Sequence, residues 1–187
     1  YRSWARGTIR EYIGVTILFI ALVIPLTNFT LFHITHQIFS GPGDATAGFL
    51  WMNAINHTVD PIVGFTNVVN YPFGQDIGGW TLVSYLAYWL PMRVLSFFFG
   101  PVAAMNLMMT YAYTSAGVAM YWLIKRITNK KALAFFAGYA AAFGPYAMLK
   151  SVGHFSYIFT AIFPILIGIF ISLWTRPTRK KAIIFGL

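Results

Sequence analysis

Acidic residues and cysteines are what this chain has fewest of. Among its 187 residues there is no cysteine, there are four aspartates and glutamates together, and 9% of the residues are charged. A soluble domain carries roughly 25% charged residues, so this chain lacks the polar surface that such a domain needs. The missing cysteines exclude disulfides and leave the redox compartment unassigned. With 58% hydrophobic residues, the composition predicts an all-α integral membrane protein.

The basic residues are grouped beside apolar runs, and this grouping accounts for the net charge of +9. Three, four and four of the thirteen lysines and arginines lie in the segments 2–10, 125–131 and 176–181. Such clusters mark the cytoplasmic side of membrane proteins. Apart from Trp4 in the first segment, they contain no interleaved aromatic residues that would stack on bases, so no nucleic-acid partner is expected.

The apolar runs predict four complete membrane spans and the start of a fifth. A spanning helix needs about 20 residues, and the expected spans cover approximately residues 12–32, 101–124, 132–148, 157–174 and, for the incomplete fifth, 182–187. The last run stops after a few residues and is expected to continue in a longer chain. We expect residues 1–187 to form a single transmembrane module at the cell membrane, with a cytoplasmic N-terminus and an extracytoplasmic loop at 33–100.

The segment 79–99 has the length of a span, but its charges argue against a crossing. If 79–99 and 101–124 both crossed, the basic cluster 125–131 would lie outside, against the positive-inside rule. Arg93 would also lie deep in the bilayer, at a cost of about 2.5–3.5 kcal/mol. We therefore expect an interfacial or re-entrant helix here, with a second juxtamembrane helix at 45–58. A true span with an inverted basic cluster is the alternative.

Three of the four carboxylates lie in the first external loop, which is the candidate site. Asp44 follows a Gly-Pro-Gly turn and suits either a general base acting on an acceptor hydroxyl or the N-cap of a helix. Asp60 precedes a proline and Asp76 follows Gly-Gln, so turn formation is the simpler role for both. The three carboxylates would also supply oxygen ligands to a divalent cation, although their spacing matches no known loop motif. Asp60 and Tyr71, which opens a Tyr-Pro-Phe-Gly turn, are candidate substrate contacts.

Three basic residues outside the cytoplasmic clusters would lie on the same side as this loop. Lys150 and His154 are four residues apart in an expected outer loop, where ammonium and imidazolium groups would attract a phosphate or diphosphate. Taken alone, snorkelling of the lysine and capping by the histidine explain them as well. Arg93 is the third candidate, because an arginine without a role is costly in an apolar segment. The gathering of scarce charges on one side favours a site.

The order of several short motifs resembles a known class of enzymes. The first apolar run is followed by GPGDATAGFLWMNAINH, YPFGQD, FFFGPVAAMNLMM, AFGPYAMLKSVGHF and FPILIG. Over nearly the whole chain this resembles the N-terminal part of polytopic membrane glycosyltransferases of the GT-C type. The resemblance implies a catalytic acid soon after the first span, which is Asp44 here, and one or two juxtamembrane helices in the first external loop. It also implies a polyprenyl-phosphate-linked sugar as donor.

The resemblance implies that the chain is part of a transferase and is inactive alone. This transferase would move a sugar from the lipid carrier to a hydroxyl of a glycan, lipid or protein on the outer side. Lys150, His154 and Arg93 would lie near the lipid phosphate, although none aligns with a specific family residue. Ala45 follows Asp44 where an Asp-Glu pair is common, so metal dependence stays open and no cofactor is assigned.

Two other classes of protein remain as alternatives. A transporter or lipid flippase fragment would need charged residues inside the spans along a midplane pathway, and the sequence has almost none. In a non-catalytic membrane scaffold, Asp44 would only cap a helix.

Overall fold

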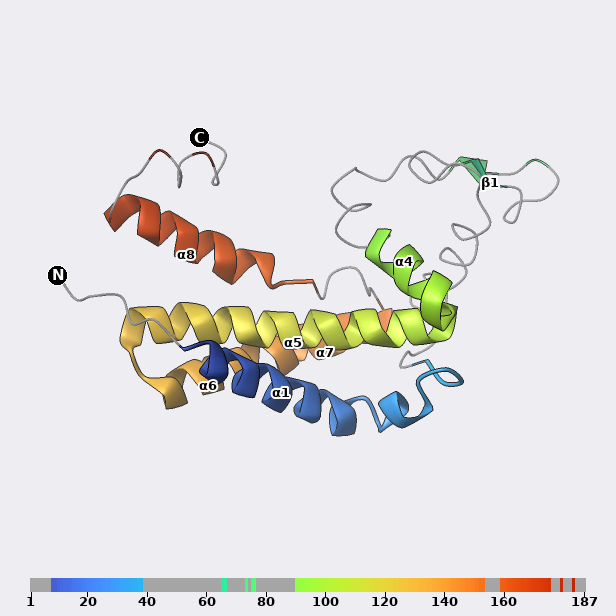
Figure 1. Ribbon diagram of the computed structural model, residues 1–187, viewed down its shortest axis with the longest axis horizontal. Coiled ribbons are helices and arrows are strands. Elements are labelled where there is room, and N and C mark those ends of the chain that lie inside the picture. The colour runs from blue at the N-terminus through green and yellow to red at the C-terminus, as the bar shows by residue number, and fades with distance from the viewer. Residues whose placement is uncertain are drawn as a thin grey trace. The chain divides into compact units, whose positions relative to one another are not determined.

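The computed structural model describes residues 8–38, 65–66, 73, 75–76, 90–153, 159–175, 179 and 183. Most of these residues are helical (Figure 1), so the expected helical class is confirmed. The helices are α1 (Ile9–Leu26), the 3-10 helix η1 (Thr30–His33), α4 (Leu90–Phe99), α5 (Pro101–Thr128), α6 (Lys131–Phe143), α7 (Pro145–Gly153) and α8 (Ile162–Thr175). Two short strands, β1 (Phe65–Thr66) and β2 (Gln75–Asp76), pair antiparallel, with Phe65 opposite Asp76.

Two helical stretches in the described part of the chain are long and apolar enough to cross a membrane. They are Ile9–Leu26 and Lys131–Ser151, and they support the expectation of a membrane protein. Helix α5 is longer, with 28 residues, but less apolar, and α8 has 14 residues. Length and hydropathy therefore single out two of the four expected spans.

The chain divides into two compact units. The first contains residues 1–23, 110–148 and 157–187, and the second contains residues 24–109 and 149–156. The boundary between the units falls inside α1 and inside α5, so each of these helices has one part in either unit.

In the first unit, three helices pack around the ring of Phe19. Phe19 of α1 is fully buried, and its ring centroid lies 5.7 Å from that of Phe135 and 6.1 Å from that of Phe143, both on α6. A Cβ on Gly117 of α5 would come within 2.6 Å of the Phe19 ring, and one on Gly138 of α6 within 2.9 Å. Glycine at these two positions lets the helices approach closely, as small residues do in membrane bundles.

Contacts along the helices of the first unit fix their directions. Tyr12 of α1 lies against Tyr121 of α5, with ring centroids 6.2 Å apart. Phe19 comes later in α1 than Tyr12, but it lies against Gly117, which comes earlier in α5 than Tyr121. Helices α1 and α5 are therefore antiparallel. The rings of Tyr113 and Phe143 stack 5.7 Å apart, and because α6 begins beside the end of α5, these two helices are also antiparallel.

Helix α8 runs in the same direction as α5. Phe159, just before α8, lies 6.3 Å from Tyr111, and Gly168 lies against Trp122. The contact points advance together along both segments, which is what parallel helices do. In chain order, α1, α5, α6 and α8 thus alternate in direction.

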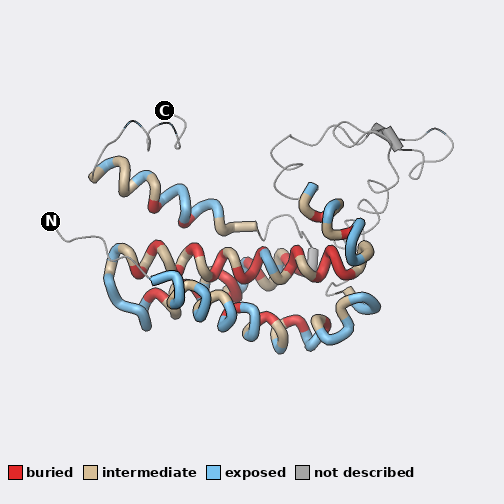
Figure 2. Tube along the Cα trace, viewed as in Figure 1, coloured by how far each residue is buried: buried red, intermediate tan, exposed pale blue. Residues whose placement is uncertain are grey.

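Helix α5 is the most buried helix described. Figure 2 shows buried residues along its length, while α1, α6 and α8 have fewer buried residues and many exposed ones. The exposed side chains on those three helices are largely apolar, including Ile13, Ile17, Phe136, Phe163 and Trp174. A helix covered by its neighbours does not need an apolar surface, which explains why α5 contains Asn, Thr, Ser and Tyr and is less apolar than α1.

The first helix ends earlier than the expected bound of residue 32. Asn28 and Phe29 have positive φ angles of 50° and 60°. The N–H of Phe29 donates to the carbonyl of Ile24 at 2.9 Å, and the N–H of Asn28 donates to that of Pro25 at 3.1 Å. This pair of bonds is a Schellman motif, and asparagine is one of the residues that tolerates its left-handed position. Pro25 therefore lies beside the helix end.

The expected third span, 132–148, is divided into two helices. Gly144 is extended, with φ −67° and ψ 165°, and separates α6 from α7. Pro145 disfavours a helical residue before it and suits the first position of the next helix. Lys150 consequently lies within α7, so the prediction that residues 150–154 form an outer loop is wrong for residues 150–153, and His154 lies outside the described residues.

Other expected bounds shift by smaller amounts or lie outside the described residues. Helix α5 extends to Thr128, and α8 begins at Ile162. Of the segment 79–99, the structure describes α4 alone. The expectation that 79–99 does not cross the bilayer therefore stays a prediction. The juxtamembrane helix 45–58 and nearly all of 182–187 lie outside the described part.

Candidate functional site

Asn106 of α5 ties the entry of the acidic loop to the helix that follows the loop. Its side chain is buried in the second unit, and its Nδ2 donates to the backbone carbonyls of Ile34, at 2.8 Å, and Gln37, at 2.7 Å. Each hydrogen bond satisfies a backbone carbonyl that lies beyond η1. Because Gly100 directly precedes α5, the segment between residues 38 and 100 starts and ends beside the N-terminal part of this helix.

Gly100 shapes the exit of the same segment. It has φ +80°, a conformation that favours glycine, and it separates α4 from α5. The N–H of Gly100 donates to the carbonyl of Ser96 at 2.9 Å, and the N–H of Ala104 donates to the carbonyl of Gly100 at 3.0 Å. Gly100 therefore divides what would otherwise be one continuous helix into α4 and α5, and it turns α4 away from the axis of α5.

Most of the predicted site residues lie outside the described part of the chain. These are Asp44, Asp60, Tyr71 and His154. The backbone of Asp76 is described in β2, paired with Phe65. The roles assigned to these residues from the sequence therefore stay predictions.

The structure places two predicted site residues, Arg93 and Lys150, on helices of the second unit. Arg93 lies on α4, half-buried, between the buried residues Met92 and Ser96. Lys150 lies in the last turn of α7, half-buried, beside the fully buried Ser151. Both side chains thus lie partly within the protein. A partly buried cation is better placed to act on a bound group than a fully solvated one.

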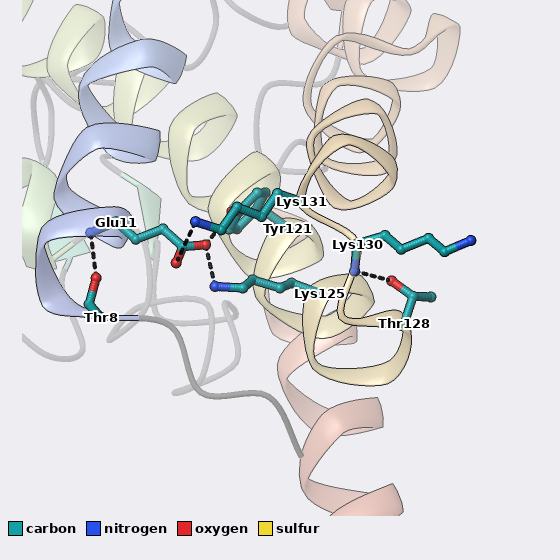
Figure 3. Close-up of polar contacts among 7 residues, drawn as sticks. All are labelled: Thr8, Glu11, Tyr121, Lys125, Thr128, Lys130 and Lys131. Atoms are coloured by element: carbon teal, nitrogen blue, oxygen red, sulfur yellow. Dashed lines mark hydrogen bonds and ion pairs between the residues drawn. The ribbon is translucent and has the colours of Figure 1, made fainter. Parts of the chain in front are cut away.

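A second polar cluster, at the C-terminal end of α5 in the first unit, was missed by the sequence analysis (Figure 3). Glu11 of α1 forms an ion pair with Lys125, and its Oε1 also accepts a hydrogen bond from the hydroxyl of Tyr121 at 2.5 Å. The Nζ of Lys131, at the start of α6, lies 3.6 Å from its Oε2. One carboxylate therefore joins three helices.

The environment of this cluster explains why these groups are paired. The side chains of Lys125 and Glu11 are only 5% and 14% exposed, whereas that of Lys131 is 71% exposed. The ammonium of Lys125 also lies 5.9 Å from the centre of the Tyr12 ring, a distance at which a cation is attracted to the ring face. A charge with so little water needs a partner of opposite charge, and Lys125 and Glu11 supply it to each other.

Both oxygens of Glu11 already have protein partners, so the cluster acts as a clamp between helices and not as a reactive acid. The sequence contained two signals for it. Thr8 and Glu11 have the spacing of a capping box, and the N–H of Glu11 lies 3.3 Å from the Oγ1 of Thr8. A lone glutamate at the edge of an apolar run also implies a buried partner, and Tyr121 and Lys125 are one helical turn apart.

A metal site is not visible in the described ranges, which contain no group of three or more His, Asp or Glu side chains able to hold an ion. The carboxylates expected as cation ligands, Asp44, Asp60 and Asp76, have side chains outside those ranges, so their role as ligands stays a prediction.

Searches against protein-family models, curated proteins and solved structures each found no match to this chain.

Proposed function

We propose that the chain is the N-terminal membrane module of a GT-C-like glycosyltransferase. In this proposal α1, α5, α6 with α7, and α8 are the four spans, the run from residue 182 begins a fifth, and α4 lies at the interface. The alternating helix directions in the first unit support this topology. The apolar exposed surfaces of α1, α6 and α8 support a lipid environment.

The observation that carries the proposal is the closure of the acidic loop by Asn106. Its two hydrogen bonds, at 2.8 and 2.7 Å, bring the residues before the loop beside the helix after it. The two ends of the segment that contains Asp44, Asp60 and Asp76 thereby lie at the N-terminal part of α5, whereas the basic residues 125–131 follow at its C-terminal end. By the positive-inside rule the basic end is cytoplasmic, so the acidic loop is extracytoplasmic.

The proposed reaction is an inverting transfer. Asp44 takes the proton of an acceptor hydroxyl, whose oxygen attacks the anomeric carbon of the donor sugar. The bond between that carbon and the phosphate oxygen breaks, and the carrier leaves as polyprenyl phosphate. Lys150, His154 and Arg93 stabilise the negative charge that grows on the leaving phosphate, the largest electrostatic contribution expected in such a step.

The test is Asp44→Asn in the intact enzyme, with Asp60→Asn as the matched control in the same loop. Membranes that contain each variant are incubated with polyprenyl phosphate carrying a radiolabelled sugar, and label in the acceptor fraction is counted. A lost general base lowers the rate by roughly 10²–10⁴-fold. We expect that loss for Asp44→Asn at normal protein level and a smaller effect for Asp60→Asn. Transfer at a near-normal rate would remove Asp44 from the mechanism and favour a scaffold.

A further inference from the structure

The end of the first unit at which α5 passes into α6 carries a strong excess of positive charge. Among the described residues of α1, α5 and α6, its basic side chains are Arg10 on α1, Lys125 and Arg126 on α5, and Lys130 and Lys131 at the start of α6, and the one acid is Glu11. Glu11 and Lys125 neutralise each other inside the cluster. The four other cations, Arg10, Arg126, Lys130 and Lys131, form a basic rim around it.

The cations of the basic rim point outward to different degrees. Arg10 and Lys130 are exposed, and the side chain of Lys131 is 71% exposed. Figure 3 shows the Lys130 side chain extending away from Glu11, while its backbone N–H donates to the Oγ1 of Thr128 at 3.2 Å. The guanidinium of Arg126 lies 5.3 Å from the centre of the Trp122 ring. Glu11 carries one negative charge and pairs with both Lys125 and Lys131, so this end of the unit keeps a net positive charge.

Large exposed apolar side chains lie close in sequence to the cations of the rim. Ile9 precedes Arg10, Ile127 follows Arg126, and Leu133 and Phe136 follow Lys131 on α6, and all four are exposed. Trp122, stacked by Arg126, is the type of side chain found at the boundary between lipid tails and water. Cations and apolar side chains exposed at the same end of the unit complement the two parts of a phospholipid, its phosphate and its hydrocarbon tail.

We propose that the basic rim binds the phosphate headgroups of anionic phospholipids, with their acyl chains against Ile9, Ile127, Leu133 and Phe136. Charge complementarity selects the lipid, because a headgroup with net negative charge gains from every rim cation, whereas a zwitterionic one brings its own ammonium. The exposed apolar side chains distinguish a lipid from a soluble anion, which would gain nothing from them. This binding does not depend on the proposed sugar transfer.

The experiment measures lipid retained by the purified chain in non-ionic detergent, by native mass spectrometry. The probes are phosphatidylglycerol and phosphatidylcholine with identical acyl chains. The test variant is Arg10→Gln with Lys130→Gln, since neither side chain belongs to the Glu11 ion pairs. The matched control is Arg10→Lys with Lys130→Arg, which keeps the charge at both positions.

We expect the parent chain to retain phosphatidylglycerol in clear preference to phosphatidylcholine. Basic residues near an anionic surface each add to the attraction, so the neutralised variant should lose roughly tenfold or more in retention while the charge-keeping control loses little. Equal retention of both lipids by the parent, or unchanged retention by the neutralised variant, would overturn the proposal.

Inorganic phosphate in large excess distinguishes the two sources of the anion. If it displaces phosphatidylglycerol completely, the rim is a soluble-anion site and the lipid proposal fails. Thermal unfolding in lipid-free detergent verifies that the variants are folded. If the double variant does not fold, Lys130→Gln is measured against Lys130→Arg, because Lys130 is exposed and both variants keep the hydrogen bond from its backbone N–H to Thr128.

Discussion

Glu11 illustrates what a single carboxylate does at the end of an apolar helix. Three of the four acids lie in one loop, so the sequence draws attention to that loop and away from the fourth. The structure places Glu11 between Tyr121, Lys125 and Lys131. Tyr121 and Lys125 are 110 and 114 residues away in the chain, so the capping-box spacing could predict that Glu11 begins a helix but not which cation it meets.

Removing the charge of Glu11 should destabilise the first unit. In Glu11→Gln the ammonium of Lys125 stays nearly buried without a counter-charge, and breaking one side of a buried ion pair costs about 3–5 kcal/mol. The expected loss is at the lower end of that range, since water can reach Lys125 near the helix end. The measurement is the unfolding midpoint in mixed micelles of detergent and sodium dodecyl sulfate.

Two variants serve as controls for this loss. Lys131→Gln removes a cation whose side chain is 71% exposed, and exposed pairs contribute about 0–1 kcal/mol. Glu11→Leu combined with Lys125→Met removes both charges and should recover most of the stability. Equal destabilisation by Glu11→Gln and Lys131→Gln would show that burial of the pair is unimportant.

At the scale of whole helices, apolar runs predict where helices lie better than they predict where helices end. The ends depend on single residues. Asn28 ends α1 through a left-handed turn, and Asn129, with φ 58°, follows the last residue of α5. Gly144 and Pro145 divide what hydropathy treats as one run. Backbone geometry of this kind is local, but asparagine and glycine also occur inside helices, so the sequence does not say which of them is used.

Close packing between α5 and α6 gives a prediction about glycine. A Cβ on Gly138 would lie 2.6 Å from the carbonyl oxygen of Gly117 and 2.9 Å from the Phe19 ring. Gly138→Ala should therefore separate the helices and destabilise the first unit by about 1–3 kcal/mol, the usual cost of overpacking.

Gly14→Ala is the matched control, because Gly14 lies inside α1 with no neighbouring atom within 4 Å of the place that an added methyl group would take. Alanine there should be neutral or stabilise the helix by up to about 1 kcal/mol. The same micelle unfolding measurement compares the two variants. If Gly138→Ala stabilises as much as Gly14→Ala, the contact between α5 and α6 is looser than these distances imply.

For the whole molecule, the expectation with most consequences is that 79–99 does not cross the bilayer. The absence of native cysteine makes a direct test simple. Phe73→Cys places a thiol at an exposed position in the acidic loop, and Lys130→Cys places one in the basic rim. A membrane-impermeant maleimide should label Phe73→Cys in intact cells and should label Lys130→Cys only after permeabilisation.

The reverse pattern, or labelling of both thiols in intact cells, would contradict the proposed topology. If both were labelled, 79–99 would be a span and the basic cluster inverted, as in the alternative considered from the sequence. The basic rim would then meet a different leaflet, and the arrangement of Asp44 with Lys150 and His154 would have to be abandoned.

The candidate site is the part of the molecule in which the structure describes the fewest of the residues predicted from the sequence. Composition was sufficient to predict helices and a membrane environment, because both depend on sums over many residues. Asp44 and His154 lie outside the described residues, so the site built on them stays a prediction. Asn106, which anchors that loop, has no sequence pattern that would reveal its distant backbone partners.

The hydrogen bond from Asn106 to the carbonyl of Gln37 joins residues that are 69 positions apart in the sequence. This separation matters for changes in the segment between them. The entropy of closing a flexible loop rises by only about 0.6 kcal/mol for each doubling of its length. An inserted or exchanged segment between residues 38 and 100 would therefore add little strain to the two hydrogen bonds of Asn106. Under the proposed transferase function, exchanging this segment would change the substrate preference without disturbing those two bonds.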